Sequence, residues 1–126
     1  MVSVLSRWPA TAVVAALIAL ITHLPPPALP PAPLFPHADK LVHFLAYLLL
    51  GALLFRSVSH KVADNPWLAV IMAAGAGIVF GVLDEWSQRF TGRTPDAADF
   101  LVDVLGLGCG AAGVLLVRRW RRRNGD

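Results

Sequence analysis

Four long apolar segments constrain the fold of this 126-residue chain more than any other feature. They cover residues 8–24, 41–55, 67–83 and 97–117. A helix needs roughly 17 to 25 residues to cross a bilayer, and the third and fourth segments reach that length. The second segment reaches it only when Asp39, Lys40 and His43 are included in its first turns. The sequence therefore predicts an all-α, four-helix transmembrane bundle that forms a single domain, with helices over residues 8–24, 39–56, 67–88 and 95–118.

The composition argues against an ordinary soluble domain, since 56% of the residues are hydrophobic and the mean hydropathy is +0.63. The net charge of +3 does not indicate a nucleic-acid partner, because five of the eleven basic residues form one tail directly after the fourth segment. Such a tail is typical of a cytoplasmic membrane anchor beside anionic lipid headgroups. The single cysteine, Cys109, excludes an internal disulfide and a cysteine zinc site.

The first apolar segment has two interpretations. Arg7 followed by an apolar stretch is compatible with a cleaved secretory signal, but no small-x-small cleavage site follows. We expect an uncleaved first helix, joined to the second by a proline-rich loop at 25–38 with polyproline II character. A cleaved signal stays open as the alternative, and it would leave the sidedness of the other helices unchanged.

Basic residues are unevenly distributed between the two predicted sides of the membrane. Eight lysines and arginines fall on the side of the termini and three on the other. The excess of basic residues in cytoplasmic loops predicts that both termini are cytoplasmic. The predicted location is the bacterial cytoplasmic (inner) membrane, in which the chain is multi-pass and has the lipid bilayer as its partner.

Polar side chains gather at the predicted outer ends of the helices. Ionisable groups at membrane depth cost a few kcal/mol each, so such a cluster is a candidate functional site. We expect no cofactor and no metal ion. The candidate ligand-binding residues are Asp39, Lys40, His43, Asp84, Glu85, Gln88, Arg93, Asp99 and Asp103.

Spacing places the polar residues of the second helix on one face. Asp39 and His43 are four apart, and Lys40, His43 and Tyr47 follow at intervals of three and four. A purely structural interpretation has Asp39 capping the helix, Lys40 extending to the membrane surface, and His43 and Tyr47 bonding to neighbouring helices.

The third helix ends in two adjacent carboxylates, Asp84 and Glu85, which oppose the helix dipole there. Lys40 and Arg93 are the cations expected to stabilise them. Gln88 lies four residues from one carboxylate and three from the other, so its side chain can reach either. The alternative is an ordinary helix end wetted by water.

The fourth helix places Asp99 and Asp103 on one face, four residues apart. Both cannot stay ionised at membrane depth unless a cation neutralises them; otherwise one is protonated. The candidates are a neighbouring basic residue, protonated His43, a metal ion or a cationic ligand. Thr94 is expected to cap this helix ahead of a proline, with Asp96 as a favourable anion in its first turn.

Small residues four apart predict close helix packing, as in Gly77 with Gly81, Gly106 with Gly110, and Gly108 with Ala112. From these pairs we expect the third and fourth helices to cross tightly. That crossing would bring Asp84 and Glu85 beside Asp99 and Asp103.

Three polar motifs in this order resemble the VanZ-like family of small bacterial membrane proteins. They are Asp39-Lys40-x-x-His43-Phe44, Asp84-Glu85-x-x-Gln88-x-Phe90, and Gly92-Arg93 followed by Asp99, Gly106 and Gly110. The resemblance covers about residues 39–113, and Asp103 departs from it because the family usually has asparagine there. It implies an envelope-facing membrane protein connected with glycopeptide (teicoplanin) resistance, and it supplies no reaction.

Three functions are compatible with these features. The first is a binding protein whose outer pocket holds an envelope lipid or a glycopeptide-type ligand. The second is a membrane-embedded enzyme acting on a lipid-linked envelope substrate, although neither Ser87 nor Cys109 is expected beside a base. The third is a proton- or ion-coupled carrier, which the lack of charged residues in the inner helix halves disfavours. The oligomeric state is not determined by the sequence.

Overall fold

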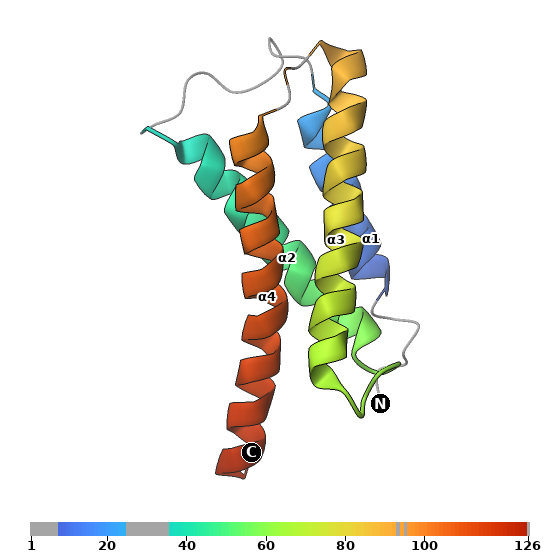
Figure 1. The fold of residues 1–126 in the computed structure, drawn as a ribbon, viewed down its shortest axis with the longest axis vertical. Helices are drawn as coiled ribbons and strands as arrows, with labels where there is room; N and C mark the ends of the chain where they lie inside the picture. The colour runs from blue at the N-terminus through green and yellow to red at the C-terminus, as the bar shows by residue number, and fades with distance from the viewer. Residues whose placement is uncertain (1–7, 25–35, 93, 95, 126) are drawn as a thin grey trace.

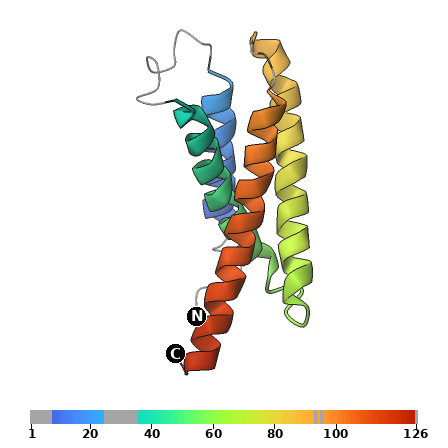
Figure 2. The same ribbon diagram turned by 60° about the vertical axis from the view of Figure 1, so that its left-hand side comes forward.

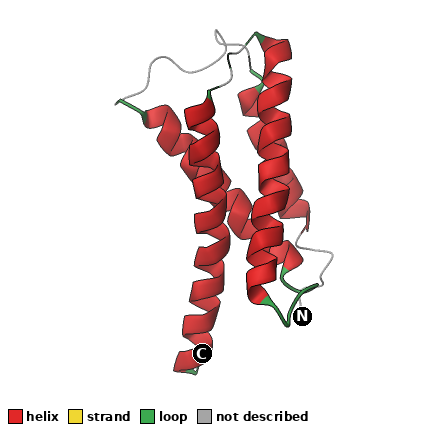
Figure 3. Ribbon diagram, in the orientation of Figure 1, coloured by secondary structure: helices red, strands yellow, loops and turns green. Residues whose placement is uncertain are grey.

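The structure is a computed structural model that describes residues 8–24, 36–92, 94 and 96–125. Its elements follow the order α1 (Trp8–Thr22), α2 (Ala38–Val58), α3 (Pro66–Gln88), the short 3-10 helix η3 (Arg89–Thr91) and α4 (Ala97–Asn124). No strand occurs in the described ranges, as Figure 3 shows. The predicted all-α bundle is confirmed. The proline-rich loop lies largely outside the described residues.

Three helical stretches are long and apolar enough to cross a membrane, namely Ala38–Val58, Pro66–Thr91 and Ala97–Asn124. The chain is therefore a multi-pass membrane protein. Helix α1 is apolar but has only 15 residues. At 1.5 Å per residue it is about 22 Å long, which is less than the roughly 30 Å of a hydrocarbon core. A membrane crossing by α1 stays a prediction.

Helix α4 begins and ends later than the sequence predicts. Its N-cap is Asp96, whose side chain accepts a hydrogen bond from the backbone N–H of Ala98 at 2.8 Å, so the predicted cap at Thr94 is wrong. A carboxylate at this position pairs one of the free N–H groups of the first turn and suits the positive end of the helix dipole. At the other end the helix continues through the arginine tail to Asn124, because arginine forms helix readily and its charge suits a helix C-terminus.

Helices α2 and α4 form the tightest pair in the bundle (Figures 1 and 2). The chain reverses direction at each connection, so these two helices run parallel to each other. A Cβ on Gly106 would collide with the carbonyl oxygen of Phe44, and one on Gly110 with that of Leu48. Glycine at both positions lets the two backbones touch.

Helices α3 and α4 do pack together, but the predicted approach of Gly106 and Gly110 to α3 is wrong, because both glycines meet the α2 backbone. Gly77 of α3 faces the side chain of Leu107 rather than the backbone of α4, and nothing lies within 4 Å of a Cβ placed on Gly108. The glycines of α4 that need close approach face α2. Two small residues four apart allow close packing on any neighbouring helix. Their spacing therefore does not indicate whether α2 or α3 is the partner.

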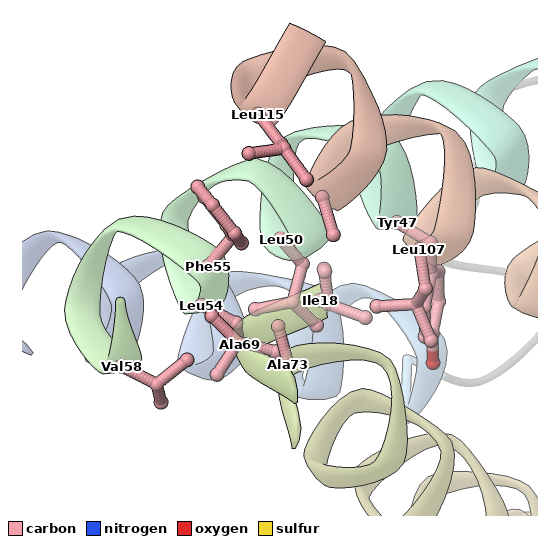
Figure 4. Packing of buried hydrophobic residues seen from close by; sticks show 11 residues of the cluster. Ile18, Tyr47, Leu50, Leu54, Phe55, Val58, Ala69, Ala73, Leu107 and Leu115 are labelled. Carbon is pink, nitrogen blue, oxygen red and sulfur yellow. The ribbon is translucent and has the colours of Figure 1, made fainter. Parts of the chain in front are cut away.

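The core lies where α2, α3 and α4 converge (Figure 4). Leu50 and Phe55 of α2 and Leu107 of α4 are each 1% exposed. Ala69 and Ala73 of α3 are fully buried, and their small side chains let α3 approach this cluster. Helix α1 packs on α2 and α3, to which it contributes the buried Ile18.

Candidate functional site

Two residues of α2 each hold a carboxylate of α4. Lys40 Nζ donates to Oδ1 of Asp99 at 2.7 Å and to Oδ2 of Asp96 at 3.4 Å. One turn deeper, Nδ1 of His43 lies 3.0 Å from Oδ1 of Asp103. Because the helices are parallel, successive turns of α2 meet successive turns of α4. The sequence predicts that Asp99 and Asp103 need a neutralising partner. Each has a separate one on α2.

The exposure of these side chains falls with depth. At the rim, Asp39 is 56% exposed and lies 3.7 Å from Lys40 Nζ, while Asp96 is 51% exposed. Asp99 is 21% exposed, and Asp103 is 6% exposed. Burial limits the access of dissolved ions, so salt screens the deeper contacts less than those at the rim.

Asp96 connects the start of α4 to both neighbouring helices. Its backbone N–H donates to Oε1 of Glu85 on α3 at 2.8 Å. The Ala98 N–H, together with the ammonium of Lys40, holds the pKa of the Asp96 carboxyl below its usual value. We call the whole set the α2–α4 network; it comprises Asp39, Lys40, His43, Glu85, Asp96, Asp99 and Asp103.

Asp84 does not join this network, although the sequence places it there. It is 6% exposed and accepts hydrogen bonds from Oγ1 of Thr22 at 2.9 Å and from Nε2 of Gln88 at 3.0 Å. Successive residues of a helix point about 100° apart, so Asp84 and Glu85 cannot both face the same neighbour. Asp84 faces α1, and Glu85 faces the start of α4.

A second polar cluster forms where α1 meets the end of α3. His23 places Nε2 2.6 Å from Oγ of Ser87 and Nδ1 2.7 Å from the carbonyl oxygen of Ala19, while Oδ1 of Asp84 lies 3.6 Å from Nδ1. Ser87 Oγ also lies 2.8 Å from the Asp84 carbonyl oxygen. We call this set the α1–α3 cluster; it comprises Thr22, His23, Asp84, Ser87 and Gln88.

The expectation that Ser87 has no base beside it is wrong. The base is His23, which is 64 positions from Ser87 in the sequence, so no local pattern relates the two residues. The available signal was the polar pair Thr22-His23, which ends an otherwise apolar segment. Such a pair at a helix end needs hydrogen-bond partners from another helix.

Tyr47 of α2 is a buried polar side chain in this part of the bundle. It is 2% exposed. Gly81 of α3 lies against its ring, where an added Cβ would be 3.6 Å from the hydroxyl oxygen. The phenol of Tyr47 is therefore buried against α3.

A groove opens beside Glu85 at this end of the bundle, with a volume of about 410 Å³. Its apolar wall includes Val82, Trp86 and Phe100. Its polar lining comes from Glu85, Arg89 and Asp96. The groove can accept an amphiphile, since carboxylates take hydroxyl or ammonium donors while the aromatic rings cover an apolar chain.

The remaining predicted site residue, Arg93, lies outside the described residues. Within the described ranges, no three histidine, cysteine or acidic side chains are grouped so that they could hold a metal ion. Comparisons with protein-family models, with curated proteins and with solved structures found no match to this chain. The fold and the site together define an all-α multi-pass membrane protein in which the α2–α4 network and the α1–α3 cluster lie at one end of the bundle.

Proposed function

We propose that this chain is a VanZ-like protein of the bacterial cytoplasmic membrane that binds an envelope ligand at the Glu85 groove. The order of the three polar motifs supports the family assignment. The single observation that carries the binding function is the groove itself, because it combines acidic groups with an aromatic wall at the end of the membrane-spanning helices. A lipid-linked headgroup or a glycopeptide-type molecule has this combination of hydroxyl or amine donors and apolar surface.

The polar residues at this end of the bundle have two proposed roles, because some hold α2 against α4 and others contact the ligand. Lys40 is engaged by Asp99 and Asp96, so its charge serves the α2–α4 contact. Glu85 and Arg89 line the groove and are the side chains proposed to contact the ligand. This assignment leaves Lys40, a candidate ligand-binding residue in the sequence-based hypothesis, without a ligand contact.

The distribution of charge supports an outward-facing groove. At the opposite end of the bundle, Lys61 lies over the ring of Trp8 and Arg119 over the ring of Trp67. Arg118 there donates to Oγ of Ser59 at 2.9 Å. Basic residues favour the cytoplasmic side, so the groove lies on the outer side with both termini inside. A groove on the outer side can bind a glycopeptide, or the envelope molecule that the glycopeptide targets. Such binding would connect the site to teicoplanin resistance.

The test is a susceptibility measurement in a bacterial host that expresses the chain. Glu85→Gln and Arg89→Gln are expected to abolish any increase in the teicoplanin concentration needed to stop growth, with unchanged protein level. Asp64→Asn is the matched control, since Asp64 is an exposed acid in the α2–α3 connection at the other end. Resistance that persists at full strength in the Glu85→Gln variant would contradict the proposal.

The contact between His23 and Ser87 favours an enzyme as the second candidate. In this function Ser87 Oγ attacks the acyl carbon of a lipid ester while His23 Nε2 takes its proton, the ester alcohol leaves with that proton, and water then hydrolyses the acyl-serine. The carbonyl oxygen of Ala19, 2.7 Å from Nδ1, would orient the imidazole, and a groove of about 330 Å³ beside the imidazole would admit an acyl chain. A fluorophosphonate probe should label Ser87 and fail to label a His23→Gln variant. Absence of labelling in the unaltered protein removes this candidate.

A further inference from the structure

A second groove lies between α2 and α4 at the end of the bundle that carries the arginine tail. It has a volume of about 590 Å³. Three arginines line it, Arg56 from α2 and Arg118 and Arg121 from α4. The rest of its lining is apolar or small, and among the described residues it contains no acid. The groove therefore combines concentrated positive charge with an apolar floor on the membrane-spanning helices.

One of the three arginines, Arg118, is held in place by contacts with α2 and the residue that follows it. Arg118 donates from Nη1 to Oγ of Ser59 at 2.9 Å, and its guanidinium carbon lies 5.2 Å from the centre of the Phe55 ring. Both partners belong to the end of α2 or the residue that follows it. Arg121 follows Arg118 by three residues, so it shares the same side of α4. Guanidinium groups bind the oxygens of a phosphate through paired N–H donors.

The floor of the groove contains space that the protein does not fill. A Cβ placed on Gly113 would meet nothing within 4 Å, in contrast to the neighbouring Gly110, which is in contact with the backbone of α2. Gly113 is therefore not required for close helix packing. It leaves a hollow on the membrane-spanning part of α4, between the arginines and the middle of the bilayer.

We propose that this groove binds one anionic phospholipid, with its phosphate on Arg56, Arg118 and Arg121 and an acyl chain along the hollow at Gly113. A phospholipid fits because its charge lies at the membrane boundary and its chain points toward the bilayer centre, in the same order as the arginines and the hollow. A soluble anion would use the arginines and leave the apolar floor uncovered. This site is separate from the Glu85 groove and does not depend on the function proposed for it.

The experiment measures retained lipid by native mass spectrometry of the full chain released from detergent micelles. The micelles contain phosphatidylglycerol and phosphatidylcholine with identical acyl chains. The Arg56→Gln/Arg121→Gln double variant is compared with Arg122→Gln/Arg123→Gln, which loses the same amount of charge from residues outside this groove. Gly113→Leu is compared with Gly108→Leu, because Gly108 is equally open but does not line the groove. Thermal unfolding of each variant verifies that it is folded.

The expected result is selective retention of phosphatidylglycerol, weakened about fivefold for each groove arginine removed. Gly113→Leu should lower retention as well, while both control variants retain lipid as the unaltered chain does. Inorganic phosphate in excess should not displace the lipid. Equal retention of the two phospholipids, or equal losses in the two double variants, would overturn the proposal, since either would show only general attraction of the tail to charged surfaces.

Discussion

His43 Nδ1 lies 3.0 Å from Oδ1 of Asp103, which joins α2 to α4 inside their membrane-spanning segments. Asp103 is about 9 Å along α4 from the start of the helix, at 1.5 Å per residue. The contact is one turn from the close approach of Gly106 to the α2 backbone. The polar pair and the glycine contact therefore specify the same register between the two parallel helices.

Loss of the Asp103 side chain should weaken this register. We expect Asp103→Leu to lower the free energy of unfolding by about 1–2 kcal/mol, the upper range for polar contacts between membrane helices. Asp103→Asn should cost less than half as much, because an amide can still bond to His43. Unfolding in mixed micelles with increasing SDS measures the difference. Equal losses in the two variants would show that the hydrogen bond to His43 does not stabilise the bundle.

The glycine contacts predict a sharp difference between two neighbouring positions of α4. Gly110→Val should destabilise the bundle by about 1–3 kcal/mol or prevent its folding, because the added atoms would collide with the α2 backbone. Gly108→Val should have little effect, since its Cβ enters open space. Thermal unfolding of the two variants in the same detergent compares them. A similar loss at both positions would contradict the assigned α2–α4 interface.

Asp96 predicts a dependence of stability on pH. Its pKa in the folded protein lies below the usual 3.8, so its contribution is present above that value and is lost as the pH falls through the folded-state pKa. The Asp96→Asn variant should keep a capping side chain but lack this component. Melting temperatures between pH 5 and about pH 2 should therefore fall less steeply on acidification in the variant. Identical slopes would show that Asp96 has no altered pKa.

Cysteine accessibility tests the proposed sidedness. In a Cys109→Ala background, Thr94→Cys should react with an impermeant maleimide added to intact cells, and Asp64→Cys should react only after the membrane is opened. The two positions lie in the connections at opposite ends of the bundle. Labelling of both positions from the same side would contradict the topology on which the outward-facing groove depends.

Much of the fold follows from local patterns. The apolar segments predicted where α2, α3 and α4 lie to within a few residues, except at the C-terminal end of α4, where the helix continues through the arginine tail. The three-and-four spacing of Lys40 and His43 placed them on one face, and both face carboxylates of α4. These features could be predicted from the sequence because helical periodicity and hydrophobicity depend on residues close together in the chain.

The choice of partners was decided only by the tertiary structure. Gly106 and Gly110 could have packed on any neighbouring helix, and the adjacent Asp84 and Glu85 looked equivalent in the sequence. The parallel approach of α2 and α4 selects the glycine partner, and the rotation of α3 turns Asp84 toward Thr22 and His23. By itself the sequence determined which faces of which helices are polar, small or apolar. Which of those faces meet depends on how all the helices fill space together, and no segment carries that information alone.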